Sequence, residues 1–298
     1  MTATSQTTPA TYLDLWGLVQ DGRPVETPSS VLMPVRRGDE RAMLKVARVD
    51  EERRGGGVMA WWAGRGAVRV LEHDDTAVLL ERAVGPRSLA IPVATGLGTA
   101  GWEREDRHAT EVLCEVARTL HAVDAAEPER PPAVVPLDRW FRDLLAVEGT
   151  LRGFLHRSAV TARELLADPW DETVLHGDLH HGNVLDTGTV QSAQWRVIDP
   201  KGLVGERGFD YANIVCNPTP EVAVSPGRLE RQVEVISAAA DLDRDRLLRW
   251  VVAWTGLSYV WHTSEGTGPD GPSPSATAVL TVGRAAEQLL RDGQQPAR

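Results

Sequence analysis

The residues with the clearest chemical potential are an aspartate and an asparagine in one loop and a second aspartate further along the chain. Asp178 and Asn183 lie five positions apart in a polar stretch between apolar runs, and Asp199 follows a third apolar run. This spacing places a carboxylate and an amide oxygen on the same side of one turn. Phosphoryl transfer requires oxygen ligands for Mg²⁺ and a group that orients a hydroxyl nucleophile. The three side chains therefore predict phosphoryl transfer.

The same residues have the spacing of a kinase catalytic loop. In that arrangement Asp178 is the catalytic base, and Asn183 and Asp199 are the metal ligands. No Gly-x-Gly-x-x-Gly loop precedes Lys45, and the chain contains no Ala-Pro-Glu segment, which argues against a protein kinase. We therefore expect a kinase whose acceptor is a small molecule.

Three histidines near Asp178 leave a second interpretation open, a metal site built from His176, His180, His181 and Asp178. The His-x-His-x-Asp-His order of common metallohydrolases is absent, and such a site would leave the nearby asparagine unexplained. We expect His176 to hold the loop through backbone contacts. We expect His180 and His181 to be solvated.

A lysine in the first part of the chain is a candidate nucleotide ligand. Lys45 lies inside the apolar run 42–47, where an ammonium group is costly unless it is paired. Its partner is expected on the following segment, where Glu51 and Glu52 are adjacent. The alternative is an edge-strand lysine with a solvated head.

The elements that must position these residues divide the chain into two parts. Up to about Arg82, short apolar runs separated by turns predict strands over 31–33, 42–47, 68–73 and 76–81. Gly55-Gly56-Gly57 lowers the expectation of a regular helix after residue 50. Beyond residue 85 the apolar period becomes helical, with a helix that ends before Pro128, a loop over 128–136, and helices over 137–155 and 162–166. Strands are expected at 173–176, 183–185 and 194–198, and the chain after Asp210 is mostly helical with breaks at 218–226 and 266–274.

Several blocks together resemble the aminoglycoside phosphotransferase family, in particular its streptomycin 6-phosphotransferase and hydroxyurea-kinase branch. The blocks are residues 62–71, 176–183 and 197–206, extended by Phe209 and Ala212-Asn213. The resemblance covers about residues 26–217. It implies an α+β, two-lobed protein-kinase-like fold with a β-rich N-terminal lobe (1–82), a larger helical C-terminal lobe (83–298) and a hinge at about 81–86.

The resemblance also implies a site for ATP and Mg²⁺. Lys45 would contact the α- and β-phosphates and Glu52 would hold its side chain, with Glu51 as the second choice. A serine-bearing loop would replace the glycine-rich one. The remaining nucleotide contacts implied by the family are Ser29 and Ser30 in the phosphate loop, and the Glu81 carbonyl and Ala83 amide at the adenine.

The acceptor site is less clearly indicated. The formal charge of −10 excludes a basic nucleic-acid footprint and is compatible with an acidic cleft that attracts a cationic acceptor. Trp250, Trp254 and Trp261 recur at helical spacing, as core residues or as part of the acceptor site. The candidate acceptor contacts are Asp178, Trp261, Glu265 and Lys201. Lys201 follows Asp199 by two residues, which puts a phosphate oxygen within its reach; the alternative is a solvated surface lysine. Asp210 is expected to be structural, at the start of a helix.

The predicted function is ATP-dependent phosphorylation of an aminocyclitol antibiotic, at a hydroxyl of the streptidine ring of streptomycin, which would confer resistance. Hydroxyurea or an amino sugar such as glucosamine are alternative acceptors. A catalytically silent nucleotide-binding scaffold is an alternative of another class. The intact set Lys45, Asp178, Asn183 and Asp199 argues against it.

The remaining features indicate a globular protein that acts on a small molecule. The N-terminal residues show neither a basic leader nor an apolar block, and no apolar run approaches the roughly 18 residues that span a bilayer. We therefore expect a cytoplasmic monomer without membrane or nucleic-acid partners. Cys114 and Cys216 show no metal-binding spacing and are expected to be buried free thiols.

Overall fold

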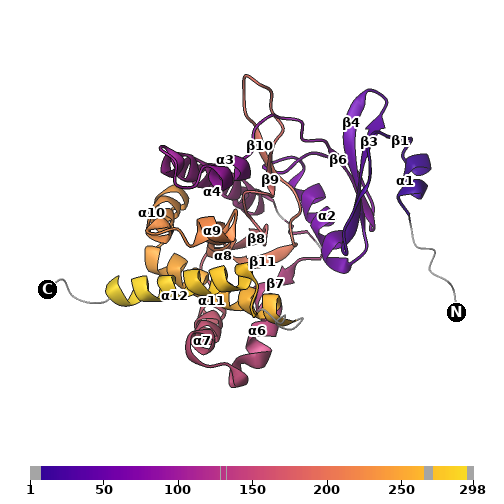
Figure 1. The fold of residues 1–298 in the computed structure, drawn as a ribbon. Coiled ribbons are helices and arrows are strands. Elements are labelled where there is room, and N and C mark those ends of the chain that lie inside the picture. The colour runs from indigo at the N-terminus through magenta and orange to yellow at the C-terminus, as the bar shows by residue number, and fades with distance from the viewer. Residues whose placement is uncertain (1–7, 128, 132, 265–270, 294–298) are drawn as a thin grey trace.

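A computed structural model of the chain describes residues 8–127, 129–131, 133–264 and 271–293. Its N-terminal part contains a six-stranded antiparallel sheet in the order β1-β3-β4-β6-β5, and β2 also pairs with β3. Figure 1 shows this sheet to one side of the helical part. The elements of this part are α1 (Pro9–Leu15), β1 (Val19–Gln20), β2 (Val25–Glu26), β3 (Ser30–Arg37), β4 (Glu40–Ala47), α2 (Asp50–Trp62), β5 (Val70–His73) and β6 (Ala77–Glu81).

Alternation along β4 explains how this sheet presents a lysine to the cleft. Leu44 and Val46 are buried in a small core that also contains Tyr12 of α1 and Leu79 of β6. Successive side chains of a strand point to opposite faces, so Lys45 lies on the other face of the sheet. The strands predicted over 42–47 and 76–81 therefore correspond to β4 and β6.

Helix α2 is regular through its three consecutive glycines, although helix propensity argues against this. The physical reason is close packing. A β-carbon on Gly55 would overlap the carbonyl oxygen of Pro200, the residue after Asp199. Gly55 thus allows the helix backbone to approach the Asp199 segment, and this tertiary contact outweighs the local cost.

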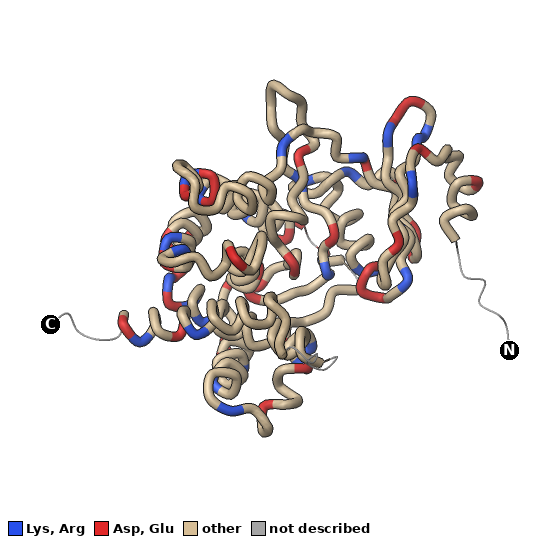
Figure 2. The backbone as a smooth tube through the Cα atoms, viewed as in Figure 1, with Lys and Arg blue, Asp and Glu red and all other residues tan. Residues whose placement is uncertain are grey.

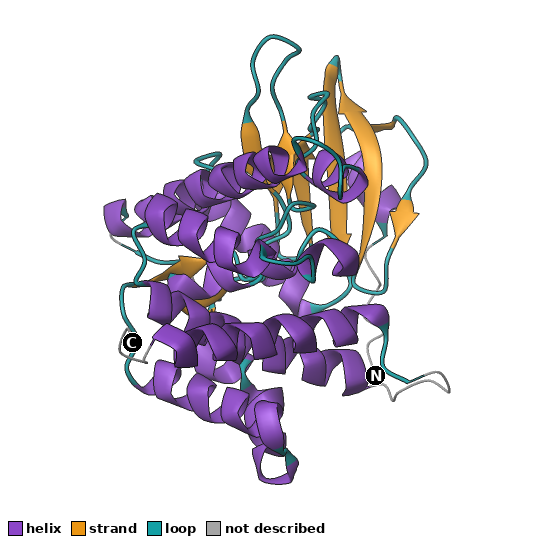
Figure 3. Ribbon diagram, turned by 60° about the vertical axis from the view of Figure 1, so that its left-hand side comes forward, coloured by secondary structure: helices purple, strands orange, loops and turns teal. Residues whose placement is uncertain are grey.

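The larger C-terminal part is helical, with five short strands (Figure 3). Its helices are α3 (Ala90–Thr95), α4 (Trp102–Ala126), α5 (Leu137–Trp140), α6 (Arg142–Val147), α7 (Gly153–Ala167), α8 (Gly208–Ala212), α9 (Pro220–Ala223), α10 (Arg228–Ala240), α11 (Arg244–Ser264) and α12 (Pro274–Gly293), with short 3₁₀ turns η1 (Glu148–Thr150) and η2 (Ile214–Cys216). Its strands are β7 (Val135–Pro136), β8 (Glu172–Leu175), β9 (Val184–Asp186), β10 (Trp195–Val197) and β11 (Leu203–Glu206).

Three features of this part differ from the sequence prediction. The segment 137–155 is not one helix: α5 and α6 are separate, and α7 begins at Gly153 and includes the helix predicted at 162–166. The predicted loop 128–136 contains β7, which pairs in parallel with β11. Strand β11 was not predicted. It is only four residues long and includes a glycine, so its sequence carries little strand signal.

The short strands bring the two functional loops together. Strand β8 enters the loop 176–183 and β9 leaves it, while β10 leads into the segment 198–202 and β11 leaves that segment. Strand β9 pairs with β10, and β8 with β11. Two backbone hydrogen bonds join the loops directly, from the Ile198 amide to the Asn183 carbonyl (2.9 Å) and from the Lys201 amide to the His176 carbonyl (2.7 Å).

One large apolar core runs from α2 into the helical part, so the two lobes share buried surface at their base. Trp62, the last residue of α2, is fully buried in this core with Leu113 and Leu120 of α4. Figure 2 shows acidic and basic residues on both lobes. Both cysteines are free: Cys114 is buried as expected, whereas Cys216 is only partly buried. In the described part of the chain, no helix has the length and apolar character to cross a membrane.

Candidate active site

Asp178 lies at the centre of the candidate site, held by two asparagine side chains. The Asn213 side-chain amide donates to Asp178 Oδ1 (2.8 Å). The Asn183 side-chain amide donates to the Asp178 carbonyl oxygen (2.9 Å) and lies 3.4 Å from Oδ2. The carboxylate remains about one-third exposed. It is therefore oriented by neutral donors and still accessible to an acceptor hydroxyl.

His176 holds the loop and does not face a substrate. Its Nε2 donates to the Ile198 carbonyl (2.9 Å), and its Nδ1 accepts from the Asp178 amide (3.2 Å). One donor and one acceptor describe a neutral imidazole. Burial lowers the pKa of His176, which agrees with this neutral form. Trp62 stacks on the ring with centroids 6.3 Å apart.

The other two histidines differ from the expectation that both are solvated. His181 is buried, and burial lowers its pKa to about 3. His180 lines the cavity described below, with its Nε2 3.9 Å from Asp178 Oδ2. The described residues contain no cluster of three or more His, Cys, Asp or Glu side chains that could hold a metal ion, so the histidine metal site finds no support.

Asp210 anchors the loop from below. It lies in the first turn of α8, is buried, and accepts from the amides of His176 (2.9 Å) and Gly177 (2.7 Å) and from His121 Nε2 (2.9 Å). Burial alone would raise the pKa of Asp210, but His121 and the loop amides hold it below its usual range. Asp210 is therefore structural, although its role is to fix the loop backbone and not to cap a helix.

On the nucleotide side, a line of ion pairs crosses from one lobe to the other. The Lys45 ammonium contacts both Glu52 of α2 and Asp199. The Ser29 hydroxyl donates to the other Glu52 oxygen (2.7 Å). The structure thus pairs Lys45 with Glu52 and not with Glu51.

Asp199 has a strained backbone that places its carboxylate in the cleft. Its φ is +64°, a conformation that residues other than glycine adopt at a cost. Burial alone would raise its pKa, but the charges of Lys45 and Lys201 lower it. The group is therefore ionised and available as an oxygen ligand.

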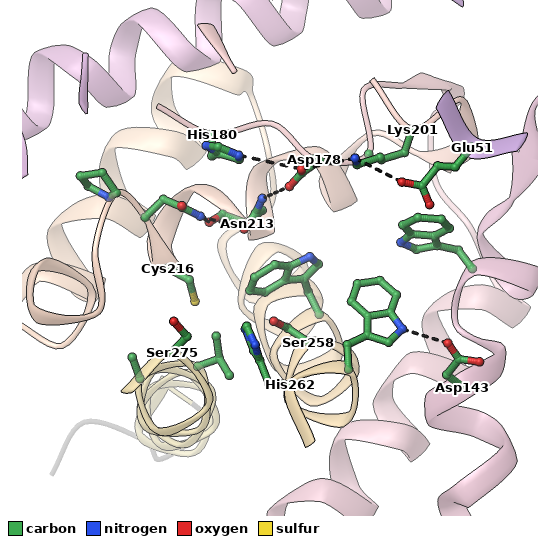
Figure 4. A pocket seen from close by; sticks show the side chains of 18 of the residues that line it. Glu51, Asp143, Asp178, His180, Lys201, Asn213, Cys216, Ser258, His262 and Ser275 are labelled. Carbon is green, nitrogen blue, oxygen red and sulfur yellow. Dashed lines mark hydrogen bonds and ion pairs between the residues drawn. The ribbon is translucent and has the colours of Figure 1, made fainter. Parts of the chain in front are cut away.

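Lys201 is the clearest departure from the sequence expectation of a solvated surface lysine. Its side chain is only 17% exposed, and Nζ lies 3.2 Å from Glu51 Oε1 (Figure 4). The same atom lies 3.9 Å from Asp178 Oδ2 and 3.9 Å from Asp199 Oδ2. Burial alone would lower the pKa of Lys201, but these carboxylates raise it above its ordinary value.

The other predicted nucleotide contacts lie in the N-terminal part of the chain and in the connector that follows β6. Strand β6 ends at Glu81, whose carboxylate accepts from Arg69, and Ala83 is partly buried in the connector that follows. The Ser30 side chain is buried and shares a hydrogen bond with Thr27 Oγ1 (3.2 Å). The adenine and phosphate contacts of these residues stay predictions.

A cavity of about 850 Å³ opens beside Asp178, between the two lobes and the end of α11. Trp254 and Trp261 line it, whereas Trp250 is a core residue whose indole N–H donates to Glu206 (2.6 Å). The Trp261 indole N–H donates to Asp143 Oδ2 (2.9 Å), as Figure 4 shows for the labelled carboxylate. Glu265, the remaining acceptor candidate, lies outside the described residues.

The cavity does not have the acidic lining that the net charge suggested. Among the described residues its lining carries three carboxylates and four cationic side chains: Glu51, Asp143 and Asp178, and Arg54, Arg139, Arg142 and Lys201. The charge of the chain therefore resides largely elsewhere. The local feature that distinguishes the cavity is a group of three indoles, Trp140, Trp254 and Trp261.

Sequence reasoning missed the residues that support the site. Asn213 orients Asp178, and the Asn217 side-chain amide in turn donates to Asn213 Oδ1 (2.9 Å). Asn213 was visible only as part of a matching block. Asparagine has no spacing rule that would have assigned this role, because the contact with Asp178 joins residues 35 positions apart.

With this geometry in place, comparison with known proteins is informative. A family model described as "Aminoglycoside/hydroxyurea antibiotic resistance kinase" matches residues 15–266. The chain belongs to this family. The predicted family is thus confirmed, and the protein is an antibiotic-resistance phosphotransferase.

Family members of known activity match most of the chain. A streptomycin 3″-kinase of Klebsiella pneumoniae is 41% identical over 283 residues, covering 93% of this chain and 100% of that protein. A streptomycin 6-kinase of Streptomyces griseus is 31% identical, covering 90% and 86%. A hydroxyurea phosphotransferase of Kitasatospora aureofaciens is 31% identical, covering 93% and 78%.

Solved structures confirm the predicted two-lobed kinase-like fold. A thermostable mutant of an aminoglycoside phosphotransferase, in ternary complex with ADP and hygromycin B, has a TM-score of 0.60 at 14% identity, covering 99% of this chain and 100% of that one. A choline/ethanolamine kinase family protein of Mesorhizobium loti has a TM-score of 0.58 at 16% identity, covering 98% and 90%. At these identities the likeness concerns the fold alone.

Proposed function

We propose that this protein transfers the γ-phosphoryl group of ATP to a hydroxyl of streptomycin. The size of the cavity beside Asp178 carries the proposal. Its volume of about 850 Å³ lies in the range of sites for drug-sized ligands, roughly 300–1,000 Å³. Hydroxyurea, with five heavy atoms, would leave most of it empty. The 41% identity to a streptomycin kinase over nearly the whole chain supports the same acceptor.

Asp178 would orient the attacking hydroxyl and accept its proton. Asn213 and Asn183 support this role because they hold the carboxylate and carbonyl of Asp178 in place. Lys45 would contact the α- and β-phosphates of ATP, with the Ser29 and Ser30 loop beside them. The Glu81 carbonyl and Ala83 amide would bind the adenine, at a hinge that we place at about residues 81–86.

The donor set fits Mg²⁺. The side-chain nitrogen of Asn183 bonds a carbonyl oxygen, so the amide orientation is fixed and its oxygen is left to act as a ligand. The Asp199 carboxylate is ionised and one-third exposed. Mg²⁺ prefers such oxygen ligands, usually one or two from the protein with the others from nucleotide phosphates and water. When bound, it would neutralise charge on the phosphates.

For the acceptor hydroxyl, we propose the 3″ position. This differs from the streptidine ring predicted from the sequence resemblance to the 6-phosphotransferase branch. The relative at 41% identity is named for the 3″ position, whereas the 6-kinases are 31% and 29% identical. The double prime places this hydroxyl on a different ring from streptidine.

Mass spectrometry after incubation with Mg-ATP tests both statements. We expect streptomycin to gain the mass of one phosphoryl group, and fragmentation should place it outside streptidine. A phosphate on the streptidine fragment would correct the position but leave the acceptor intact. Phosphorylation of hydroxyurea or glucosamine, with none of streptomycin, would overturn the acceptor.

A further inference from the structure

We propose that Lys201 is a second catalytic lysine, which contacts the phosphoryl group as it passes from ATP to the acceptor, and that Glu51 is the residue that positions it. The inference rests on the proposed phosphoryl transfer and assigns a part of that site that neither the predicted nucleotide contacts nor the acceptor cavity explains. It develops the sequence-based option that Lys201 reaches a phosphate oxygen, and it replaces the alternative of a solvated surface lysine.

The position of the Lys201 ammonium carries the proposal. It lies at equal distances, 3.9 Å, from an oxygen of Asp178 and an oxygen of Asp199. In the proposed reaction the attacking hydroxyl lies at Asp178 and the ATP phosphates lie at Asp199. The phosphorus atom must therefore cross the space between these two carboxylates. Lys201 is the cation that borders this space from the cavity side.

The structure holds Lys201 in that position from both ends. Its backbone amide donates to the His176 carbonyl (2.7 Å), which ties it to the Asp178 loop. Its ammonium pairs with Glu51 at 3.2 Å. The absence of a side chain at Gly55, where a β-carbon would overlap the Pro200 carbonyl, lets α2 bring Glu51 close enough.

Helix α2 thus distributes its adjacent glutamates between two lysines. Successive residues of a helix point about 100° apart. Glu52 faces the sheet and holds Lys45 towards Asp199, and Glu51 faces the loop and holds Lys201 near Asp178. Each lysine therefore has its own glutamate, and Lys201 lies between the two aspartates while Lys45 contacts Asp199 alone.

The composition of the chain sets these two lysines apart. Lys45 and Lys201 are the only lysines among 32 basic residues, and every other one is an arginine. An ammonium is a compact point charge with three donors, whereas a guanidinium is a broad planar fork. The Lys201 ammonium lies within 4 Å of three carboxylates, and its three donors allow it to direct one at a transferring phosphoryl group as well.

In the proposed step, the acceptor oxygen forms a bond to the γ-phosphorus while the bond from the γ-phosphorus to the β,γ-bridging oxygen breaks. The bridging oxygen leaves with the bonding electrons as part of ADP, and the hydroxyl proton passes to Asp178. Lys201 keeps its protons throughout. It donates hydrogen bonds to the phosphoryl oxygens, where charge is spread in the transition state.

Steady-state kinetics of Lys201→Met, with Lys45→Met as the matched lysine control, test the catalytic role. Removing one such donor costs roughly 10²–10³-fold in kcat. We expect that loss for Lys201→Met, with KM for ATP within a few fold of wild type, whereas Lys45→Met should also raise KM for ATP. A kcat for Lys201→Met within a few fold of wild type would overturn the proposal.

The positioning role of Glu51 is tested by the same comparison of kcat with KM for ATP. Glu51→Gln should lower kcat less than Lys201→Met and leave KM for ATP unchanged, because it loosens only the lysine at the phosphoryl group. Glu52→Gln should raise KM for ATP. If Glu51→Gln instead raised KM for ATP as Glu52→Gln does, Glu51 would be a structural support of the nucleotide site and the positioning role would be wrong.

An NMR experiment on wild-type protein needs no acceptor and no turnover. Labelling lysine with ¹³C at Cε gives two side-chain signals, which Lys201→Arg assigns. Addition of Mg-ADP should shift the Lys45 signal, and further addition of aluminium fluoride, a mimic of the transferring phosphoryl group, should shift the Lys201 signal. An unmoved Lys201 signal would overturn the inference. A shifted signal in a protein that does not phosphorylate streptomycin would refute only the acceptor.

Discussion

The interior of the helical lobe and the interface between the lobes hold catalytic residues by different means. Inside the helical lobe, buried Asp210 accepts hydrogen bonds from two backbone amides of the loop that contains Asp178. The Asn213 side chain orients the Asp178 carboxylate. Across the interface, Lys45 reaches Asp199 and Glu51 reaches Lys201 only through side-chain ion pairs.

This difference distinguishes contacts that form when the chain folds from contacts that a bound ligand can rearrange. Backbone hydrogen bonds to a buried carboxylate form with the fold, because breaking them would leave buried polar groups unpaired. Ion pairs at a partly open cleft can exchange partners when phosphates enter. The position of Asp178, the proposed base, is therefore a property of the folded chain, whereas we expect the ion pairs of Lys45 and Lys201 to change when nucleotide binds.

A fully buried ion pair in the helical lobe also helps to hold the Asp178 carboxylate in place. Arg228 is bidentate to Asp106, with contacts of 2.9–3.2 Å, and also donates to the carbonyls of Val215 (2.7 Å) and Asn217 (2.8 Å). Asn217 in turn holds Asn213. This chain of contacts connects Asp178 to the core of α4 and α10.

The largest effect should come from the base itself. Asp178→Ala should lower kcat by roughly 10²–10⁴-fold while Mg-ATP binding, measured by calorimetry, stays within a few fold. Asp199→Ala should instead abolish productive Mg²⁺ binding. Full turnover in Asp178→Ala would contradict the comparison of the two regions, because the residue that the helical lobe holds most firmly would then not be needed for catalysis.

The next effect concerns stability and tests the buried anchor. Arg228→Met leaves Asp106 as an unpaired buried charge, so unfolding in urea should show a loss of about 3–5 kcal/mol. Replacing both partners with apolar residues, Asp106→Leu with Arg228→Met, is the matched control and should recover part of that loss. An unchanged midpoint for Arg228→Met would show that the pair contributes nothing to the fold.

Variants at the interface should affect nucleotide use and leave the fold intact. Lys45→Met should reduce kcat/KM for ATP by roughly 10²-fold, with Glu52→Gln giving a milder form of the same defect. Thermal unfolding of the free protein should change less than in Arg228→Met, because Asp199 is one-third exposed and the Ser29 hydroxyl still donates to Glu52. If Lys45→Met unfolded as easily as Arg228→Met, the interface ion pairs would be part of the folding core and the distinction would fail.

The smallest effect is expected at a surface pair far from the site. Arg157 and Arg291 hold the pKa of Glu287 below its usual range. A lowered carboxyl pKa adds stability above the unfolded-state pKa of about 4.3, and this is lost as the pH falls through the folded value. Glu287→Gln should therefore cost less than about 1 kcal/mol at pH 7, and the difference from wild type should vanish under acid conditions. Unaltered kcat in this variant is the control for the series.

Local patterns were sufficient for the catalytic loop and the main strands. Asp178 and Asn183 lie in one turn, and alternation in the runs that became β3 and β4 depends only on neighbouring residues. Lys45 could be singled out because a charge inside an apolar strand is unusual. The division into a β-rich part and a helical part followed from the change of apolar period near residue 85, whereas the kinase-like fold class came from the family resemblance.

The remaining parts of the site depend on contacts between distant segments. Glu51 and Lys201 are 150 positions apart, and neither has a local signal that indicates a partner. The three glycines of α2 predict a poor helix, yet the helix is regular. Gly55 is required there because any side chain would overlap Pro200. The mixed charge of the cavity lining could not be predicted either. Net charge does not show which arginines the fold brings together around the cavity.

The location of both lysines in the cleft determines where covalent chemistry can act. Reagents that condense with amines, such as aromatic aldehydes or activated esters, would find only two side-chain targets in the chain, and both belong to the site. A compound that carries an aldehyde on a scaffold shaped for the cavity would reach Lys201 from the acceptor side, and its reaction should speed up with pH because the raised pKa of Lys201 leaves little neutral amine at pH 7. Inactivation of resistance by such a compound would not be diluted by reaction with surface lysines, because the surface has none.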